Sequence, residues 1–199
     1  MGVRMKNLIA LAGAFLLLVK TGHAQDAAHV KIDTSMGDMV VELYPDRAPQ
    51  TVENFLQYVR AGHYDRTLMH RVVKGYIIQG GGYSRLYTER VTRDPVPYEG
   101  DNDLDNERGT IAMARGAGPD SAQAQWFINL RDNTDLNHRV TDLGPMFGYA
   151  VFGRVVDGMD VADAIGAVET GPAGPFDAEA PVERIFIERV DPVEWPAAE

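Results

Sequence analysis

The chain has 199 residues and no cysteine, and its 29 acidic residues outnumber 19 basic ones, giving a net charge of −10. The acidic balance argues against nucleic acid or an anionic membrane surface as a partner, and the absence of thiols excludes disulfides. The length fits a single domain that is large enough to bury a core without cross-links.

The N-terminal segment has the outline of a secretory signal peptide. A basic start and an apolar run over residues 8–19 precede small residues that end at Ala24. Because Lys20 ends this run short of the roughly 20 apolar residues that a membrane span needs, an uncleaved anchor is the less favoured alternative. We predict a signal peptide at residues 1–24 and one domain over 25–199, in a periplasmic protein that has no stable membrane association after cleavage.

Two hydrophobic patterns follow. Segments 30–34 and 39–43 have strand character and flank a turn at 35–38, which predicts a β-hairpin. Apolar residues then recur at i, i+3, i+4 and i+7, the stripe of an amphipathic helix: Val52, Phe55, Leu56 and Val59. Pro49 suits the first turn of this helix and Gly62 its C-terminal end.

The stretch 70–82 reads His-Arg-Val-Val-Lys-Gly-Tyr-Ile-Ile-Gln-Gly-Gly-Gly and predicts two short strands around a turn at 74–75. Such a hairpin brings Arg71 close to Gln79, with apolar side chains beside them. A guanidinium, an amide and an apolar surface, without a nucleophile or a general base, suit binding and polarising a peptide group better than hydrolysing it. The alternative roles are a surface ion pair for Arg71 and a hairpin cap for Gln79.

The rest of the chain predicts short elements. A second helix is expected at 159–165 and a last strand at 182–190, followed by a tail from 192. The segments 84–107 and 131–148 are loop-like, because they lack apolar periodicity. Many short strands with two helices predict a mainly β fold, a closed antiparallel barrel capped at its ends.

Three later motifs stand in order after the stretch 70–82: Gly-Thr-Ile-Ala-Met-Ala-Arg at 109–115, Gln-Trp-Phe-Ile-Asn at 125–129 and Val-Phe-Gly-Arg-Val at 151–155. Together they resemble the signature of the cyclophilins, the peptidyl-prolyl cis-trans isomerases, in their bacterial secreted branch. The resemblance implies an eight-stranded antiparallel barrel with a helix over each opening and an active groove on its outer face. It also implies a monomer that accelerates X–Pro isomerisation in the folding of exported proteins, with proline-containing polypeptides as clients and no cofactor.

By the same resemblance, Arg71 is the catalytic residue, aimed at the prolyl nitrogen. The implied substrate-binding residues are His70, Tyr76, Ile77, Gln79, Met113, Ala114, Arg115, Gln125, Phe127, Leu136 and Tyr149. Within this set an apolar pocket comes from Tyr76, Ile77, Met113, Phe127 and Leu136. Gln79 and the main chain at Ala114 and Arg115 would bind the substrate backbone, with Gln125 alongside, and His70 would order its strand. For Ile77, Met113 and Phe127 taken singly, an ordinary core position is the alternative.

The chain departs from the family pattern at the pocket rim. Tyr76 stands where phenylalanine is usual, Asp135 where many eukaryotic members carry tryptophan, and Tyr149 where they carry histidine. The histidines have no metal-ligand spacing, so we predict no metal site. The competing function is a non-catalytic peptide-binding chaperone or scaffold module on the same fold, because a fold does not fix a function. A retained Arg71 favours the isomerase.

Overall fold

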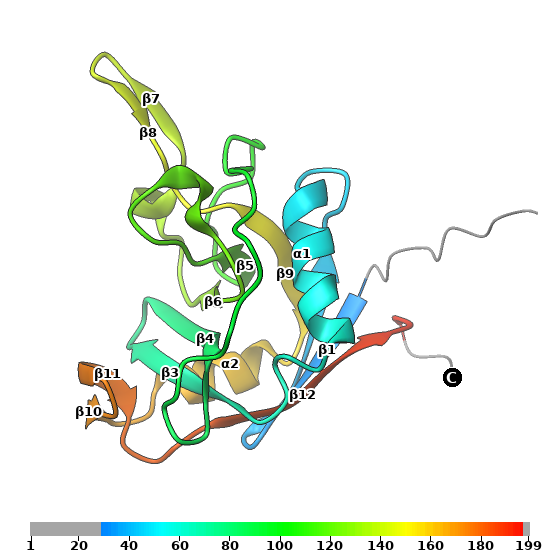
Figure 1. The fold of residues 1–199 in the computed structure, drawn as a ribbon, viewed down its shortest axis with the longest axis vertical. Helices are drawn as coiled ribbons and strands as arrows, with labels where there is room; N and C mark the ends of the chain where they lie inside the picture. The colour runs from blue at the N-terminus through cyan, green and yellow to red at the C-terminus, as the bar shows by residue number, and fades with distance from the viewer. Residues whose placement is uncertain (1–28, 197–199) are drawn as a thin grey trace, which may run out of the picture.

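The computed structural model describes residues 29–196, so the predicted signal peptide and the last three residues lie outside the described part of the chain. Eight antiparallel strands form a closed barrel in the order β1-β12-β3-β4-β6-β5-β9-β2 (Figure 1). They are β1 His29–Thr34, β2 Gly37–Leu43, β3 Thr67–Val73, β4 Ile77–Ser84, β5 Thr110–Met113, β6 Trp126–Asn129, β9 Val151–Asp157 and β12 Phe186–Val193. The predicted fold class is confirmed.

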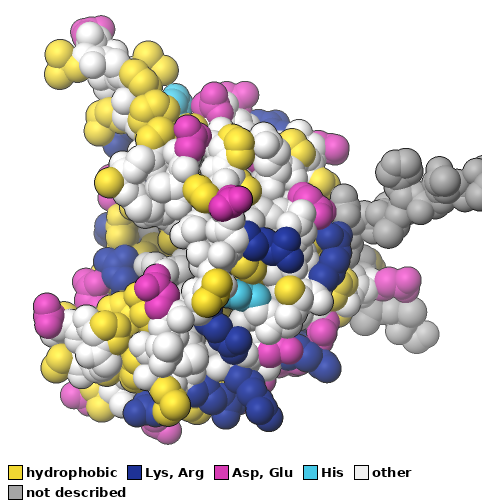
Figure 2. Space-filling model, in the orientation of Figure 1, with side chains coloured by type: hydrophobic (Ala, Val, Ile, Leu, Met, Phe, Trp, Pro, Cys, Tyr) yellow, Lys and Arg dark blue, Asp and Glu magenta, His cyan; other side chains and the backbone are white. Residues whose placement is uncertain are grey.

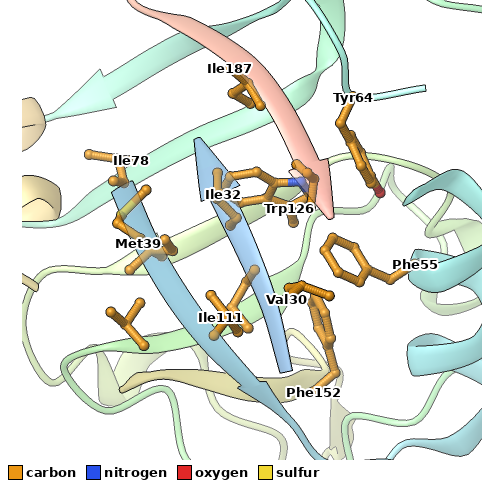
Figure 3. Close-up of a cluster of buried hydrophobic side chains, with 14 of the residues drawn as sticks. Val30, Ile32, Met39, Phe55, Tyr64, Ile78, Ile111, Trp126, Phe152 and Ile187 are labelled. Atoms are coloured by element: carbon orange, nitrogen blue, oxygen red, sulfur yellow. The ribbon is translucent and has the colours of Figure 1, made fainter. Parts of the chain in front are cut away.

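Two α-helices pack against the barrel and complete its core. They are α1 Pro49–Arg60 and α2 Met159–Gly166, at the predicted places. The apolar stripe of α1 is buried, and its Phe55 meets Phe152 of β9 with ring centroids 5.2 Å apart. Figure 3 shows both rings among side chains from β1, β2 and β6. Ile165 of α2 belongs to the same buried cluster, so each helix stabilises the barrel by burying one apolar face.

Two peripheral hairpins were not predicted. One is formed by β7 Arg139–Thr141 and β8 Gly144–Met146, and the other by β10 Thr170–Ala173 and β11 Phe176–Pro181. The first projects from the body of the molecule and carries exposed hydrophobic side chains (Figures 1 and 2). Short strands with little buried surface lack the alternation by which strands are recognised in a sequence, so the loop-like assignment of 131–148 is wrong at this hairpin.

The end of the chain also differs from expectation. The last strand runs over Phe186–Val193 and not over 182–190, because residues 182–185 connect β11 to β12. Pro192 lies opposite Val30 of β1, so the strand continues into the segment expected to be a tail. Two short 3₁₀ helices, Pro119–Ser121 and Thr134–Leu136, complete the described elements. Within residues 29–196, no helix has both the length and the apolar character of a membrane span.

Candidate active site

The strand register places the predicted arginine and glutamine in one row. Arg71 of β3 lies opposite Gln79 of β4, Gln79 opposite Phe127 of β6, and Phe127 opposite Ala112 of β5. Directly opposed residues in neighbouring strands point to the same face of a sheet. The row therefore presents a cation, an amide and an aromatic ring on the outer face of the barrel.

Hydrogen bonds link the polar members of this row. Arg71 Nη1 donates to Gln79 Oε1 at 3.2 Å, and Gln79 Nε2 donates to Gln125 Oε1 at 3.0 Å. Gln125 lies just before β6, so the chain of contacts spans three neighbouring elements. The predicted proximity of Arg71 and Gln79 is thus present. The side-chain amide of Gln79 is held on both sides, by Arg71 at its oxygen and by Gln125 at its nitrogen.

The glycine run at the end of the motif makes room for these contacts. Gly81 has φ +88°, a backbone conformation that residues with a Cβ rarely adopt. A Cβ on Gly82 would lie 2.6 Å from Cδ of Gln125, closer than real atoms approach. A side chain at Gly82 would therefore displace Gln125 from Gln79.

A second apolar cluster lies on this face, apart from the barrel core. Its buried members are Ile77, Ala112, Phe127 and Val151, and Tyr76, Ala114, Leu136 and Tyr149 are among those packed against them. The rings of Phe127 and Tyr149 meet edge to face at 5.2 Å. Most of the predicted pocket residues thus come together as a partly exposed apolar surface beside the Arg71 row.

Met113 is the exception among the predicted pocket residues. It is 1% exposed and belongs to the barrel core, opposite Trp126. Because side chains alternate between the faces of a strand, the neighbour of the outward-facing Ala112 must point into the barrel. The structure does not place Met113 in the pocket.

The rim of the apolar cluster holds an interaction that sequence reasoning missed. The Tyr76 hydroxyl donates to Asp135 Oδ2 at 2.7 Å, and the guanidinium of Arg131 lies 5.1 Å from the centre of the Tyr76 ring. Burial and the hydrogen bond to Asp135 raise the pKa of Tyr76 to about 12. The two departures at 76 and 135 are therefore coupled, since the added hydroxyl binds the added carboxylate.

The predicted backbone-binding positions lie beside a cavity of about 220 Å³, which is lined in part by Gln79, Ala114, Arg115 and Gln125. The N–H of Ala114 already donates to the carbonyl of Gln125 at 2.9 Å. The side chain of Arg115 donates to the carbonyls of Phe147 and Gly148, just after the β7–β8 hairpin, and its guanidinium lies 5.0 Å from the centre of the Tyr149 ring. Of the main-chain groups at Ala114, only its carbonyl is thus left for a substrate.

His70 orders its surroundings by ring contacts. It is 2% exposed, and its ring stacks on that of Phe176 of β11, with the ring centroids 5.4 Å apart. The ring of Tyr83 lies on it at a centroid distance of 4.8 Å. Burial lowers the pKa of His70 to about 4, so the ring is neutral near pH 7. Its Nδ1 has no hydrogen-bond partner in the described part of the chain. The ring is therefore fixed by packing against β4 and β11, and the ordering of its strand by His70 stays a prediction.

Arg71 has a further partner that no sequence motif indicated. Its Nε donates to Glu179 Oε2 of β11 at 2.7 Å. The two residues are 108 positions apart, and Glu179 lies in one of the hairpins that were not predicted. The ion-pair alternative for Arg71 is thus realised together with the contact to Gln79. No three of the metal-ligating side chains within residues 29–196 are grouped so as to hold an ion.

The sequence and the fold are similar to those of known proteins. Residues 29–191 match the family model described as cyclophilin type peptidyl-prolyl cis-trans isomerase/CLD. The chain is 49% identical over 160 residues to the peptidyl-prolyl cis-trans isomerase cyp18 of Streptomyces antibioticus, a match that covers 80% of this chain and 95% of the relative. It is 47% identical over 161 residues to peptidyl-prolyl cis-trans isomerase B of Escherichia coli strain K12, covering 81% and 97%.

A solved structure agrees with the sequence matches. It is a cyclophilin type peptidyl-prolyl cis-trans isomerase of Cryptosporidium parvum in the presence of the dipeptide Ala-Pro. The two folds agree with a TM-score of 0.65 at 26% identity, over 83% of this chain and 99% of the other. The chain therefore belongs to the cyclophilin family of peptidyl-prolyl cis-trans isomerases and is an enzyme of that class.

Proposed function

We propose that this isomerase uses Arg71 to weaken amide resonance in X–Pro bonds of exported proteins. Resonance gives the peptide bond a rotation barrier of about 18–20 kcal/mol. In the twisted transition state the prolyl nitrogen becomes pyramidal and basic, so a donor aimed at it stabilises that state more than the planar ground state. Arginine remains charged near neutral pH and presents its donors in a rigid fork.

The observation that carries this proposal is the guanidinium of Arg71, which two hydrogen bonds hold beside the apolar cluster. Nε and Nη1 of Arg71 are occupied by Glu179 and Gln79, whereas Nη2 has no protein partner among the described residues. In the row of opposed residues, Phe127 comes next after Gln79. A proline ring lying on Phe127 would share the outer face of the barrel with the guanidinium, and Nη2 is the guanidinium nitrogen left to donate to the prolyl nitrogen.

The remaining rate enhancement comes from holding the substrate. One hydrogen bond cannot supply the roughly 7 kcal/mol that a 10⁵-fold effect requires. The apolar cluster would bind the proline ring, while Gln79, Gln125 and the Ala114 carbonyl would bind the chain on either side. The dipeptide used with the Cryptosporidium parvum relative supports proline-containing polypeptides as the substrate class.

The pH dependence of activity tests this mechanism against proton transfer. Because neither a guanidinium nor a neutral His70 changes protonation near pH 7, kcat/KM is expected to be nearly flat from about pH 6 to 8. A protease-coupled or NMR-exchange assay on an X-Pro tetrapeptide measures it. A bell-shaped profile that vanished in a folded His70→Gln variant would show proton transfer to the substrate. An inactive but peptide-binding wild-type protein would instead favour the non-catalytic module.

The site of action depends on the first 24 residues, which we propose are removed during export to the periplasm. Intact-mass measurement of periplasmic material is expected to give a soluble chain that begins at Gln25. A full-length chain recovered in the membrane fraction would contradict this location, and it would leave the catalytic role of Arg71 untouched.

A further inference from the structure

The β10–β11 hairpin places a carboxylate on the arginine of the active site. Glu179 accepts from Arg71 Nε at 2.7 Å, and Gln79 accepts from Arg71 Nη1 at 3.2 Å. An arginine side chain has several rotatable bonds, so one partner alone leaves the plane of its guanidinium free to turn. Two partners on different nitrogens fix that plane.

The hairpin is itself anchored next to Arg71. Phe176, at the start of β11, stacks on His70 at 5.4 Å and meets Tyr83 edge to face at 4.9 Å. His70 precedes Arg71 on β3, against which β11 packs. The aromatic contacts therefore hold Glu179 at a fixed distance from the strand that carries Arg71.

The backbone at Glu179 supplies an independent indication. Its φ is +63°, in the left-handed region that glycine adopts freely and that glutamate seldom occupies. Strained positions of this kind gather at functional sites, where the side chain has a use that outweighs the strain. At Glu179 the side chain makes the contact with Arg71.

We infer that Glu179 is a positioning residue for isomerisation, which orients the Arg71 guanidinium so that Nη2 faces the prolyl nitrogen. The inference rests on the catalytic role proposed for Arg71. Pre-orientation removes the loss of rotamer freedom that Arg71 would otherwise suffer on reaching the transition state. Glu179 should therefore affect the rate of isomerisation and leave the affinity for the peptide nearly unchanged.

The test uses a substitution that separates stability from activity. Glu179→Gly removes the carboxylate and relieves the left-handed backbone, so the melting temperature should be unchanged or higher. The same variant should lose about fivefold to tenfold in kcat/KM, with peptide affinity by NMR titration nearly unchanged. Glu179→Gln keeps an acceptor for Nε and should lose only about twofold in kcat/KM. This variant still tests the contact if the glycine variant does not fold.

A matched control exists on the same molecule. Arg85 and Glu188 form another ion pair, with side-chain exposures of 39% and 45% against 37% and 43% for Arg71 and Glu179. Glu188→Ala removes a carboxylate of comparable exposure that has no contact with the Arg71 row. It should retain wild-type kcat/KM.

A double variant distinguishes the possible failures. In an Arg71→Ala background, Glu179→Gly should cause no further loss, because Glu179 acts only through that arginine. Unchanged or increased activity of Glu179→Gly, while Arg71→Ala is impaired, would overturn the role of Glu179 and leave that of Arg71 standing. Equal losses from Glu179→Gly in both backgrounds would also overturn it. Full activity of Arg71→Ala would overturn the proposed mechanism itself.

Discussion

Replacing Arg71 by alanine is expected to lower kcat/KM by about tenfold to a thousandfold, a loss of ~1.4–4 kcal/mol of transition-state stabilisation. The effect is large because the guanidinium meets a basic prolyl nitrogen only in the twisted state. Peptide affinity should fall much less, since the planar nitrogen is a poor hydrogen-bond acceptor. The isomerase assay and an NMR titration of the same peptide measure the two quantities separately.

Two variants control for charge and for general disruption. Arg71→Lys should restore little activity. The guanidinium has three nitrogens in one plane, two for Glu179 and Gln79 and one for the substrate, whereas an ammonium group has only one. Arg85→Ala removes the same charge and one ion pair elsewhere on the surface, and it should leave kcat/KM unchanged. Wild-type rates in the Arg71→Ala variant would exclude this residue from the mechanism.

The second large effect concerns stability at low pH. The pKa of His70 is about 4 in the folded protein because the ring is buried, whereas a histidine in an unfolded chain titrates near 6.5. Between these values the unfolded chain binds a proton that the folded chain does not. The free energy of unfolding should therefore fall as the pH is lowered, with His70 contributing about 2 kcal/mol between pH 7 and pH 5.

Urea unfolding of the wild type and of His70→Phe at both pH values isolates this contribution. Phenylalanine keeps a ring against Phe176 and Tyr83 but cannot be protonated. Burial also lowers the pKa of His63, and that histidine titrates in both proteins, so it cancels in the comparison. If both proteins lost the same stability on acidification, His70 would not be the buried neutral group described here.

The barrel and the centre of its site were predictable because their residues are locally patterned. The stripe of α1 and the hairpin around Gly75 follow from spacing and turn chemistry over a few residues. Arg71 and Gln79 were expected to meet because they flank one tight turn. The resemblance to the cyclophilins then supplied the order of the later strands, and the family match and the fold agree with it.

What could not be predicted depends on contacts between distant segments. Glu179 contacts Arg71 because Phe176 packs on His70 and so places β11 beside β3. The local sequence of β11 predicts neither contact. The binding of Tyr76 to Asp135 joins two substitutions that each look arbitrary alone. Met113 was assigned to the wrong face because the motif was transferred as a block, without the alternation that separates it from Ala112.

An isomerase of unfolded chains works beside extended segments that readily add themselves to an unpaired strand. In the closed barrel every strand has a hydrogen-bonded neighbour on each side, so no barrel strand is left with a wholly unpaired edge (Figure 1). A client on the outer face of the barrel therefore meets side chains and a few loop carbonyls, and in the barrel it finds no edge strand of the usual kind; within residues 29–196 the two-stranded sheets β7–β8 and β10–β11 keep open edges. Closure of the barrel thus removes eight strands from the sites at which an extended client chain could add itself to the enzyme.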